Sequence, residues 1–255
     1  MIMKKKDYQE EYAAGRPQMY DTESRKIKAT RMVKTLADYF GKNKLKNLTV
    51  LDVGSSTGII DNELAPYFKK ITGIDIDTGG VKFAKSKFKR KNLSFKVDDA
   101  MNLSFKNNSF DIVICAQIYE HVPNDIKLMS EIYRVLKPSG ICYLAALNRL
   151  WPMEPHHNLL FLSWLPKSLG NAYVKIAGKS DKYCETLRSY WSLRGLTKKF
   201  IVHDYTEKIL RDPKRFSYDD ELPTSGWKSE LINIITPILK YNVPTYFWLL
   251  EKPER

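Results

Sequence analysis

The chain has 255 residues, of which 43% are hydrophobic, and its 42 basic and 29 acidic side chains give a net charge of +13. Such a chain can bury a full α/β core, most simply as one domain with appendages, and its positive surface favours nucleic acid, anionic lipid head groups or phosphorylated substrates. Cys115, Cys142 and Cys184 are odd in number and lack C-x-x-C spacing, so we expect reduced thiols, not a disulfide framework.

The first 45 residues are expected to form a tail and one helix. Residues 1–7 turn polar at once, so we expect no secretory apolar segment and place the protein in the cytoplasm. A helix is predicted over residues 22–40, because its apolar side chains recur at helical spacing. This stripe consists of Ala29, Met32, Val33, Leu36 and Phe40.

A buried strand is predicted over residues 48–53, followed by a turn of small residues from Gly54 to Gly58. Such a turn lets a ligand approach the backbone, and the next helix offers it free amides. A second strand, 71–76, ends in Asp75. An acid at this point of a βαβ unit can accept both ribose hydroxyls in a bidentate contact. The spacing therefore predicts a bound nucleoside.

The turn itself narrows the kind of nucleoside. Gly54-Ser55-Ser56-Thr57-Gly58 lacks the G-x-G-x-x-G spacing of dinucleotide sites and the Gly-Lys-Ser/Thr of a Walker loop. It resembles the first motif, D-x-G-x-G-x-G, of the class I S-adenosylmethionine-dependent methyltransferases, with Ser56 in place of the middle glycine.

Later segments extend this resemblance, in particular to the methyltransferases of the ubiquinone and menaquinone pathways. Residues 97–105 resemble the family's D-A-x-x-L-P-F segment, 119–123 its E-H-V-P, and 131–140 its R-V-L-K-P-G-G turn. Residues 110–117 match the fourth strand between them. The resemblance implies S-adenosyl-L-methionine as the cofactor, with Asp99 accepting a proton from the adenine amino group. The cofactor-binding residues it implies are Asp52, Gly54, Ser55, Ser56, Gly58, Asp75, Ile76, Asp98, Asp99, Ala100, Ala116 and Gln117.

The implied fold is α/β, a doubly wound, Rossmann-like, seven-stranded, mostly parallel sheet with an antiparallel last strand and a lid insertion after strand five. The methyltransferase domain would span residues 46–255, behind an N-terminal tail and cofactor-covering helix over 1–45. Two insertions interrupt it, 149–183 as a substrate lid and 206–244. Between and after them we expect a helix over 184–198 and strands over 200–203 and 245–250. A packing role for the first insertion, without substrate contact, is the alternative.

His121 and His157 are the candidate catalytic bases, because imidazole titrates near neutral pH. His156 and His157 are adjacent and point apart, so they are not expected to share one ligand. Some quinone-pathway enzymes hold a divalent cation around this segment. Here Gln117 stands at the first of those positions, although Glu120 and His121 remain, so no metal is predicted.

Two features bear on partners. The lysines and arginine between Lys82 and Lys91 are expected to form a solvated helix face away from the cofactor cleft. Residues 231–250 have the length of a membrane span but contain Asn, Pro and Lys, so a helix and a strand explain them better. Peripheral contact with a membrane stays open, since the surface is basic and carries aromatic residues.

The favoured function is O-methylation of a small-molecule, lipid-linked or glycan acceptor by direct in-line transfer. An RNA or DNA methyltransferase is the first alternative, but Gln117-Ile118-Tyr119-Glu120 stands where an N-P-P-Y or D-P-P-Y base clamp would be. A protein that binds the cofactor without catalysis is the second. The sequence does not fix the oligomeric state.

Overall fold

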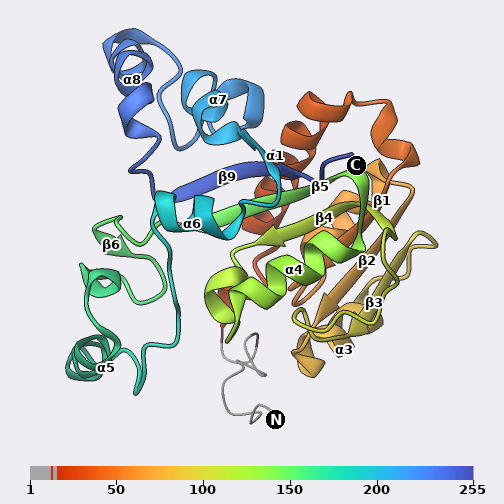
Figure 1. The fold of residues 1–255 in the computed structure, drawn as a ribbon, viewed down its shortest axis with the longest axis horizontal. Coiled ribbons are helices and arrows are strands. Elements are labelled where there is room, and N and C mark those ends of the chain that lie inside the picture. The colour runs from red at the N-terminus through yellow and green to blue at the C-terminus, as the bar shows by residue number, and fades with distance from the viewer. Residues whose placement is uncertain (1–12, 14–15, 255) are drawn as a thin grey trace.

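The structure is a computed structural model that describes residue 13 and residues 16–254. Its centre is a seven-stranded sheet in the order β3-β2-β1-β4-β5-β9-β8, shown in Figure 1. The strands are β1 (Thr49–Val53), β2 (Lys70–Asp75), β3 (Leu93–Val97), β4 (Phe110–Ala116), β5 (Leu136–Leu147), β8 (Ile201–Asp204) and β9 (Thr245–Glu251). β9 runs antiparallel to both of its neighbours, β5 and β8, while the other pairs are parallel. The predicted seven-stranded, mostly parallel sheet is confirmed, including the antiparallel last strand.

The central strands are buried because helices cover both faces of the sheet (Figure 1). One core cluster holds Leu36 of α1, Leu64 of α2 and Ile209 of α7 against the sheet. Ile132 of α4 and Leu193 of α6 belong to the cluster on the opposite face. The helices are α1 (Thr22–Phe40), α2 (Ile59–Leu64), α3 (Thr78–Lys87), α4 (Asp125–Val135), α5 (Lys167–Ile176), α6 (Tyr190–Leu196), α7 (Tyr205–Arg211) and α8 (Gly226–Leu239).

The two layers agree with the patterns in the sequence. α1 has the predicted bounds and begins at Asp21, whose carboxylate caps it by accepting from the amides of Glu23 and Ser24. The basic residues between Lys82 and Lys91 are exposed, as expected of a solvated face. Cys115 and Cys142 are buried thiols, and Cys184 is an exposed one.

Within the described residues, every helix is too short or too polar to cross a membrane.

The predicted helix over 184–198 is wrong in its first part. Residues 184–189 instead run in an extended path along the end of the sheet, where the amide of Thr186 donates to the carbonyl of Glu120. The amide of Arg188 donates to the Tyr119 hydroxyl at 3.0 Å. α6 begins only after Ser189, whose side chain caps it. These long-range contacts override the helical pattern of the segment.

The 149–183 insertion has a small core of its own at the end of β5. It contains a two-stranded ribbon of β6 (Met153–Glu154) and β7 (Leu159–Leu160), followed by α5. Leu162, Val174 and Tyr183 pack with Leu147, the last residue of β5. The insertion therefore lies at the carboxyl edge of the sheet, where Figure 1 shows it beside α6.

Candidate functional site

A cavity of about 290 Å³ opens at the carboxyl ends of β1, β2 and β4. Its walls come from the turn after β1, the ends of β2 and β4, the first half of α1 and the 149–183 insertion. The lining residues are Gln18, Met19, Arg25, Lys28, Gly54, Ser56, Ile74, Asp75, Ile76, Ala100, Ala116, Gln117, Ile118, His121, Val122, Leu147, Pro155 and His156. This is the edge at which open α/β sheets bind ligands.

Asp75 is fixed in this cavity by the turn beside it. Its Oδ2 accepts from the amide of Ser56 at 2.7 Å, and its Oδ1 accepts from the amide of Asp77 at 2.9 Å. Burial raises the pKa of Asp75, while the two amide contacts act against that rise. The carboxylate is thus held in one orientation at the end of β2, with remaining acceptor capacity.

The turn is built for close approach of a ligand. Gly54 has φ of 82° and lies so near Ile118 that a Cβ would collide with that side chain. Ser56 also has a positive φ, 48°, and lines the cavity. Small residues at both points keep the backbone accessible.

Gly58 is separated from the cavity, although the family resemblance implied that it contacts the cofactor. It does not line the cavity; a Cβ there would come within 2.5 Å of the Phe95 ring and 2.8 Å of Ala84. Gly58 thus permits the packing of the turn on α3 and β3. A valine would damage that packing, so its effect on cofactor binding would be indirect.

Asp52 lies in β1 directly before the turn and pairs with Asp61, an acid that the sequence did not single out. Both carboxyls are buried. Burial is the main cause that raises the pKa of Asp52 to about 7. Burial and the Asp52 charge together raise the pKa of Asp61 well above its usual range. At least one carboxyl therefore keeps its proton at neutral pH. Asp52 and Ser55 do not line this cavity but a smaller one of about 40 Å³, which shares Gly54 and Ser56 with it.

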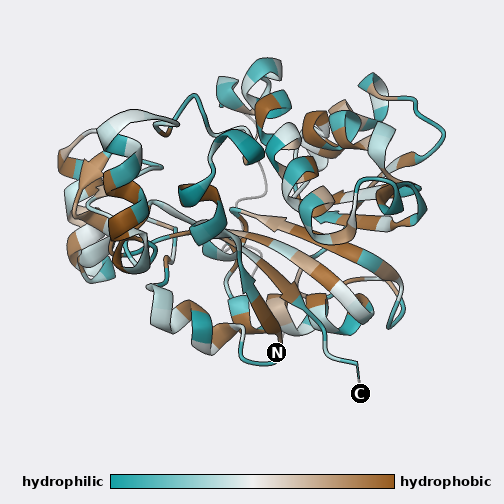
Figure 2. Cartoon of the chain, turned by 90° about the horizontal axis from the view of Figure 1, so that it is seen from above, coloured by the Kyte–Doolittle hydropathy of each residue, from teal (hydrophilic) through white to brown (hydrophobic). Residues whose placement is uncertain are grey.

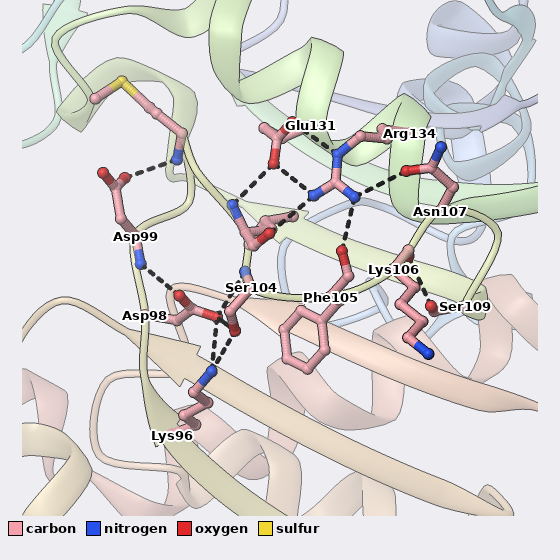
Figure 3. Close-up of polar contacts among 12 residues, drawn as sticks. Lys96, Asp98, Asp99, Ser104, Phe105, Lys106, Asn107, Ser109, Glu131 and Arg134 are labelled. Carbon is pink, nitrogen blue, oxygen red and sulfur yellow. Dashed lines mark hydrogen bonds and ion pairs between the residues drawn. The ribbon is translucent and has the colours of Figure 1, made fainter.

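The loop after β3 uses its acids to hold itself (Figure 3). Asp98 accepts from the amide and hydroxyl of Ser104, and Asp99 accepts from the amide of Met101 at 2.7 Å. Arg134 and Glu131 of α4 tie down the other side of the loop. Neither Asp98 nor Asp99 lines the cavity, whereas the next residue, Ala100, does. The adenine contact of Asp99 stays a prediction.

Seven of the predicted cofactor residues therefore meet at one cavity. They are Gly54, Ser56, Asp75, Ile76, Ala100, Ala116 and Gln117. The sequence reading missed Arg25 and Lys28, although the apolar stripe of their helix was a signal that its other face is free for the cavity. Lys28 donates from Nζ to Oε1 of Gln117 at 3.4 Å across the top of β4.

Histidines and glutamates gather where the insertion meets the end of β4. Nδ1 of His156 lies 2.6 Å from Oε1 of Glu154. The other carboxylate oxygen of Glu154 accepts from the amide of His157. Nε2 of His157 lies 3.3 Å from Oε2 of Glu185. Two carboxylates thus orient two adjacent imidazoles, which point apart as the sequence indicated.

The structure favours His156, not His157, as a group that reaches a ligand. His121 and His156 both line the cavity, and their ring centroids lie 4.9 Å apart in an edge-to-face contact. His157 does not line the cavity and instead contacts the ring of Tyr183. The sequence analysis chose His157 and not His156 as a candidate base, because two adjacent histidines offer no pattern that says which one faces inward.

Burial sets the proton affinities in this cluster. It lowers the pKa of His121 to about 3, so that imidazole is neutral at physiological pH. Burial also opposes the charge on His156, but the contact with Glu154 outweighs it and raises the pKa of His156. The pKa of Glu120 rises to about 7, again through burial. Neutral pH therefore falls within the titration range of Glu120.

The same groups have the types and spacing of a metal site. Glu120, His121 and His156 each offer one ligand atom, and these atoms lie within 4.8 Å of one another. In the described part of the chain no other residue donates a hydrogen bond to the carboxylate of Glu120, which is buried. Two imidazoles and one carboxylate suit a divalent transition metal. The prediction that no metal is needed is therefore one to test.

A second cavity, of about 240 Å³, adjoins the first and shares Lys28, Ala116 and Gln117 with it. Apolar side chains make up most of its remaining wall, between α1, α7 and β9. They are Met32, Tyr143, Ala145, Ile209, Leu210, Tyr218, Leu222, Val243, Pro244 and Phe247. The Lys28–Gln117 contact lies where the two cavities meet.

Comparison with known proteins agrees with this geometry. Residues 51–144 match the family described as "Methyltransferase domain". The ubiquinone biosynthesis O-methyltransferase of Coxiella burnetii is 29% identical over 107 residues, 41% of this chain and 46% of that protein. The chain thus spans about half the length of this curated relative.

Solved structures show the same fold. The YcgJ protein of Bacillus subtilis has a TM-score of 0.53 at 18% identity, covering 88% of this chain and 97% of its own. Phosphoethanolamine N-methyltransferase 2 of Haemonchus contortus, in complex with phosphomonomethylethanolamine and S-adenosylhomocysteine, has a TM-score of 0.52 at 23% identity. That match covers 86% of this chain and 52% of the other.

Proposed function

We propose that this chain, a member of the class I S-adenosylmethionine-dependent methyltransferases, methylates an oxygen atom of a small-molecule, lipid-linked or glycan acceptor. The observation that carries the proposal is a single cavity lined both by Asp75 and by His121 and His156. A carboxylate suited to bind ribose hydroxyls and a pair of imidazoles thus face one volume.

The residues of this chain fit the cofactor. The fixed carboxylate of Asp75 has acceptor capacity for the ribose hydroxyls, and the turn at Gly54 and Ser56 leaves the backbone open to the methionine portion. When bound, the cofactor supplies a methyl group on a sulfonium, which is already strongly activated. The protein then has to align the acceptor and exclude water.

His156 is our candidate for the group that takes the acceptor's proton. The carboxylate of Glu154 accepts from Nδ1, which leaves Nε2 as the basic nitrogen of the neutral imidazole. Because Glu154 is itself buried, its charge acts on His156 with little screening. His121, kept neutral by burial, is placed to hydrogen-bond the acceptor.

The apolar second cavity favours an acceptor with a hydrophobic portion. It meets the first cavity at Gln117, so an acceptor could place its reacting oxygen near His156 and its apolar part beside α7. This supports a lipid-linked acceptor over a glycan or a nucleic acid. The nucleic-acid alternative rests on net charge alone.

The experiment is incubation with methyl-labelled S-adenosylmethionine and a cell extract separated into lipid, nucleic acid, protein and small solutes. We expect the label in the lipid fraction, and much less with His156→Ala. Asp219→Ala, which changes an exposed acid that lines neither cavity, is the matched control. Label in nucleic acid alone would contradict the proposal.

A further inference from the structure

Three cations of α1 lie along the two cavities. Arg25, Lys28 and Arg31 follow one another at a spacing of three residues, so they share one side of the helix. Arg25 lines the first cavity, Arg31 lines the second, and Lys28 lines both. A ligand that extends from one cavity into the other therefore passes the Lys28 ammonium.

Arg31 is neutralised by its own neighbours. Its Nε donates to the carbonyl of Ser217 at 2.8 Å, and its terminal nitrogens lie 2.6 Å from a carboxylate oxygen of Asp220 and 2.7 Å from one of Glu221. Its guanidinium carbon lies 4.0 Å from the centre of the Tyr218 ring. Arg31 thus ties α1 to the segment before α8, and these contacts occupy its charge.

Arg25 faces the turn after β1. It lines the smaller cavity together with Gly54 and Ser56, and it does not line the second cavity. One of its terminal nitrogens donates to the sulfur of Met19 at 2.7 Å. Its charge opposes the rise in the pKa of Asp52, the residue before the turn. Arg25 therefore acts on the side of the site that suits the cofactor.

Lys28 has a neutral partner instead of a counter-ion. Its Nζ donates to Oε1 of Gln117 at 3.4 Å, and it forms no ion pair with residue 13 or with residues 16–254. Burial and the charges of Arg25 and Arg31 lower the pKa of Lys28. Glu221 acts against this fall, but Arg31 holds its carboxylate. A partly buried charge without an opposite charge costs free energy, which an anion bound beside Lys28 would recover.

Gln117 adds donors at the same point. An ammonium can only donate, so Gln117 turns Oε1 toward Lys28 and leaves Nε2, with two hydrogens, for another acceptor. The backbone of Gln117 has φ of 58°, a left-handed conformation that residues with a Cβ rarely adopt. Its amide donates to the carbonyl of Ala145 at 2.8 Å, which holds the residue at the end of β4. Lys28 and Gln117 thus form a pair of hydrogen-bond donors where the cavities meet.

The second cavity indicates what is joined to the anion. Its wall includes Tyr143, Ala145 and Phe247 of β5 and β9, strands of the sheet whose hydrophobic residues are brown in Figure 2. Glu221 is the acid of this wall, and Arg31 neutralises it. An apolar chain gains free energy by leaving water for such a wall, whereas an inorganic ion does not. The two features together suit an anionic group with an apolar chain.

We propose that Lys28 and Gln117 bind an anionic group of the acceptor, a carboxylate or a phosphate, while the acceptor's apolar chain lies in the second cavity. The acceptor is then an anionic amphiphile whose hydroxyl lies on the side of His156. The inference rests on the proposed function for the methylation of that hydroxyl. Binding of the anion is measured without methyl transfer.

The test is calorimetric titration of the full chain, in the presence of S-adenosylhomocysteine, with octyl phosphate, octanoate and octanol. We expect at least one of the anions to bind about tenfold more tightly than octanol, the effect of one hydrogen bond to a charged group. The anion that binds more tightly identifies the group. Lys28→Met should abolish the difference and leave octanol binding unchanged. The matched control is Lys26→Met, which changes an exposed lysine of α1 that lines neither cavity.

A variant of Leu222 tests the position of the chain. Leu222→Trp enlarges a side chain in the wall of the second cavity and should weaken the binding of all three octyl compounds. Inorganic phosphate, which has no chain, should bind at least about tenfold more weakly than octyl phosphate. Unchanged affinity for S-adenosylhomocysteine shows that each variant is folded. If Leu222→Trp has lost that affinity, Leu222→Phe replaces it.

Octanol that binds as tightly as both anions would overturn the proposal, as would a wild type that binds none of the three. A folded Lys28→Met protein that no longer binds S-adenosylhomocysteine would assign Lys28 to the cofactor and also overturn it. Octyl compounds that bind equally to the wild type and the Leu222 variant would place the chain elsewhere, against the proposal. Anion binding that depends on Lys28, in a protein that labels no fraction of the extract, would contradict the proposed function and leave the anion site intact.

Discussion

The amide of Ser56 donates to Oδ2 of Asp75 at 2.7 Å, which joins the turn after β1 to the last residue of β2. The turn that must receive the methionine portion of a cofactor is therefore held by the carboxylate that would bind its ribose. Binding of the two portions is coupled through this contact, since a shift of the turn moves the acid.

Asp75→Ala should weaken S-adenosylmethionine binding by about 2 kcal/mol, because hydrogen bonds to a charged group contribute about 1.5–3 kcal/mol. Calorimetric titration measures this, with Asp219→Ala as the control. Asp75→Asn should recover part of the loss, since the amide oxygen still accepts one hydrogen bond. An Asp75→Ala protein that folds and binds like the wild type would remove Asp75 from the site.

The two adjacent histidines should differ sharply. His156 lines the cavity, so His156→Ala should cut the rate of methyl transfer by 10²-fold or more, a typical size for loss of a general base. His157→Ala should cost less than about threefold, because the His157 ring contacts Glu185 and Tyr183 outside the cavity. Both should bind the cofactor normally. Equal losses in the two variants would return the question to His157.

Glu154→Gln should shift the pH dependence of the rate. Burial lowers the pKa of His156 and the Glu154 carboxylate raises it more, so the net direction is upward. The base works only when deprotonated, and its rate therefore rises as pH passes its pKa. Without the Glu154 charge this rise should begin at lower pH, while the maximum rate falls because Nδ1 is less firmly oriented. A pH profile unchanged in Glu154→Gln would exclude His156 as the base.

The buried pair of Asp52 and Asp61 should make the protein less stable as pH rises toward neutrality. Their folded pKa values lie above the usual range, so between about pH 4 and pH 7 the folded chain holds more protons than the unfolded one. The free energy of unfolding then falls with rising pH in that window. Asp61→Asn should flatten the fall and raise the melting temperature at pH 7, whereas Asp219→Asn should do neither. Thermal unfolding at several pH values measures both.

Chelation separates proton transfer from metal binding at Glu120, His121 and His156. Our account gives His156 the acceptor's proton and His121 a hydrogen bond to the acceptor, and it needs no metal, so dialysis against a chelator should leave the rate of methyl transfer unchanged. Metal analysis of the purified protein is the matching measurement. One bound divalent ion per chain, with activity lost on chelation and restored by that ion, would contradict the prediction that no metal is needed.

The fold could be predicted from local patterns in the sequence, because apolar runs indicate the strands of the sheet and small or polar residues indicate the turns that follow them. The apolar run at Val50 and the acid at Asp75 lie on adjacent strands, and their spacing alone predicted a nucleoside-binding site at the ends of these strands. The helix at 184–198 was misjudged because its first residues are held by Glu120 and Tyr119, far away in sequence.

The sequence could not decide between His156 and His157 for the same reason. Which of them faces the cavity depends on Glu154 and Glu185, and no spacing rule links these acids to the pair. For Gly58 a sequence pattern did exist but was misleading. The family motif implied that Gly58 contacts the ligand, whereas its neighbour in space is Phe95. Motifs place a loop near the ligand, while packing decides which atom of the loop reaches it.

The most direct test of the central claim is transfer of label from methyl-labelled S-adenosylmethionine by wild type, His156→Ala and Asp75→Ala side by side, with cofactor affinity measured on the same proteins. Our account predicts labelled lipid from the wild type, labelling slowed about 10²-fold or more with normal cofactor affinity in His156→Ala, and weakened cofactor affinity in Asp75→Ala. Tight binding of the cofactor by the wild type with no label in any fraction of the extract would contradict it.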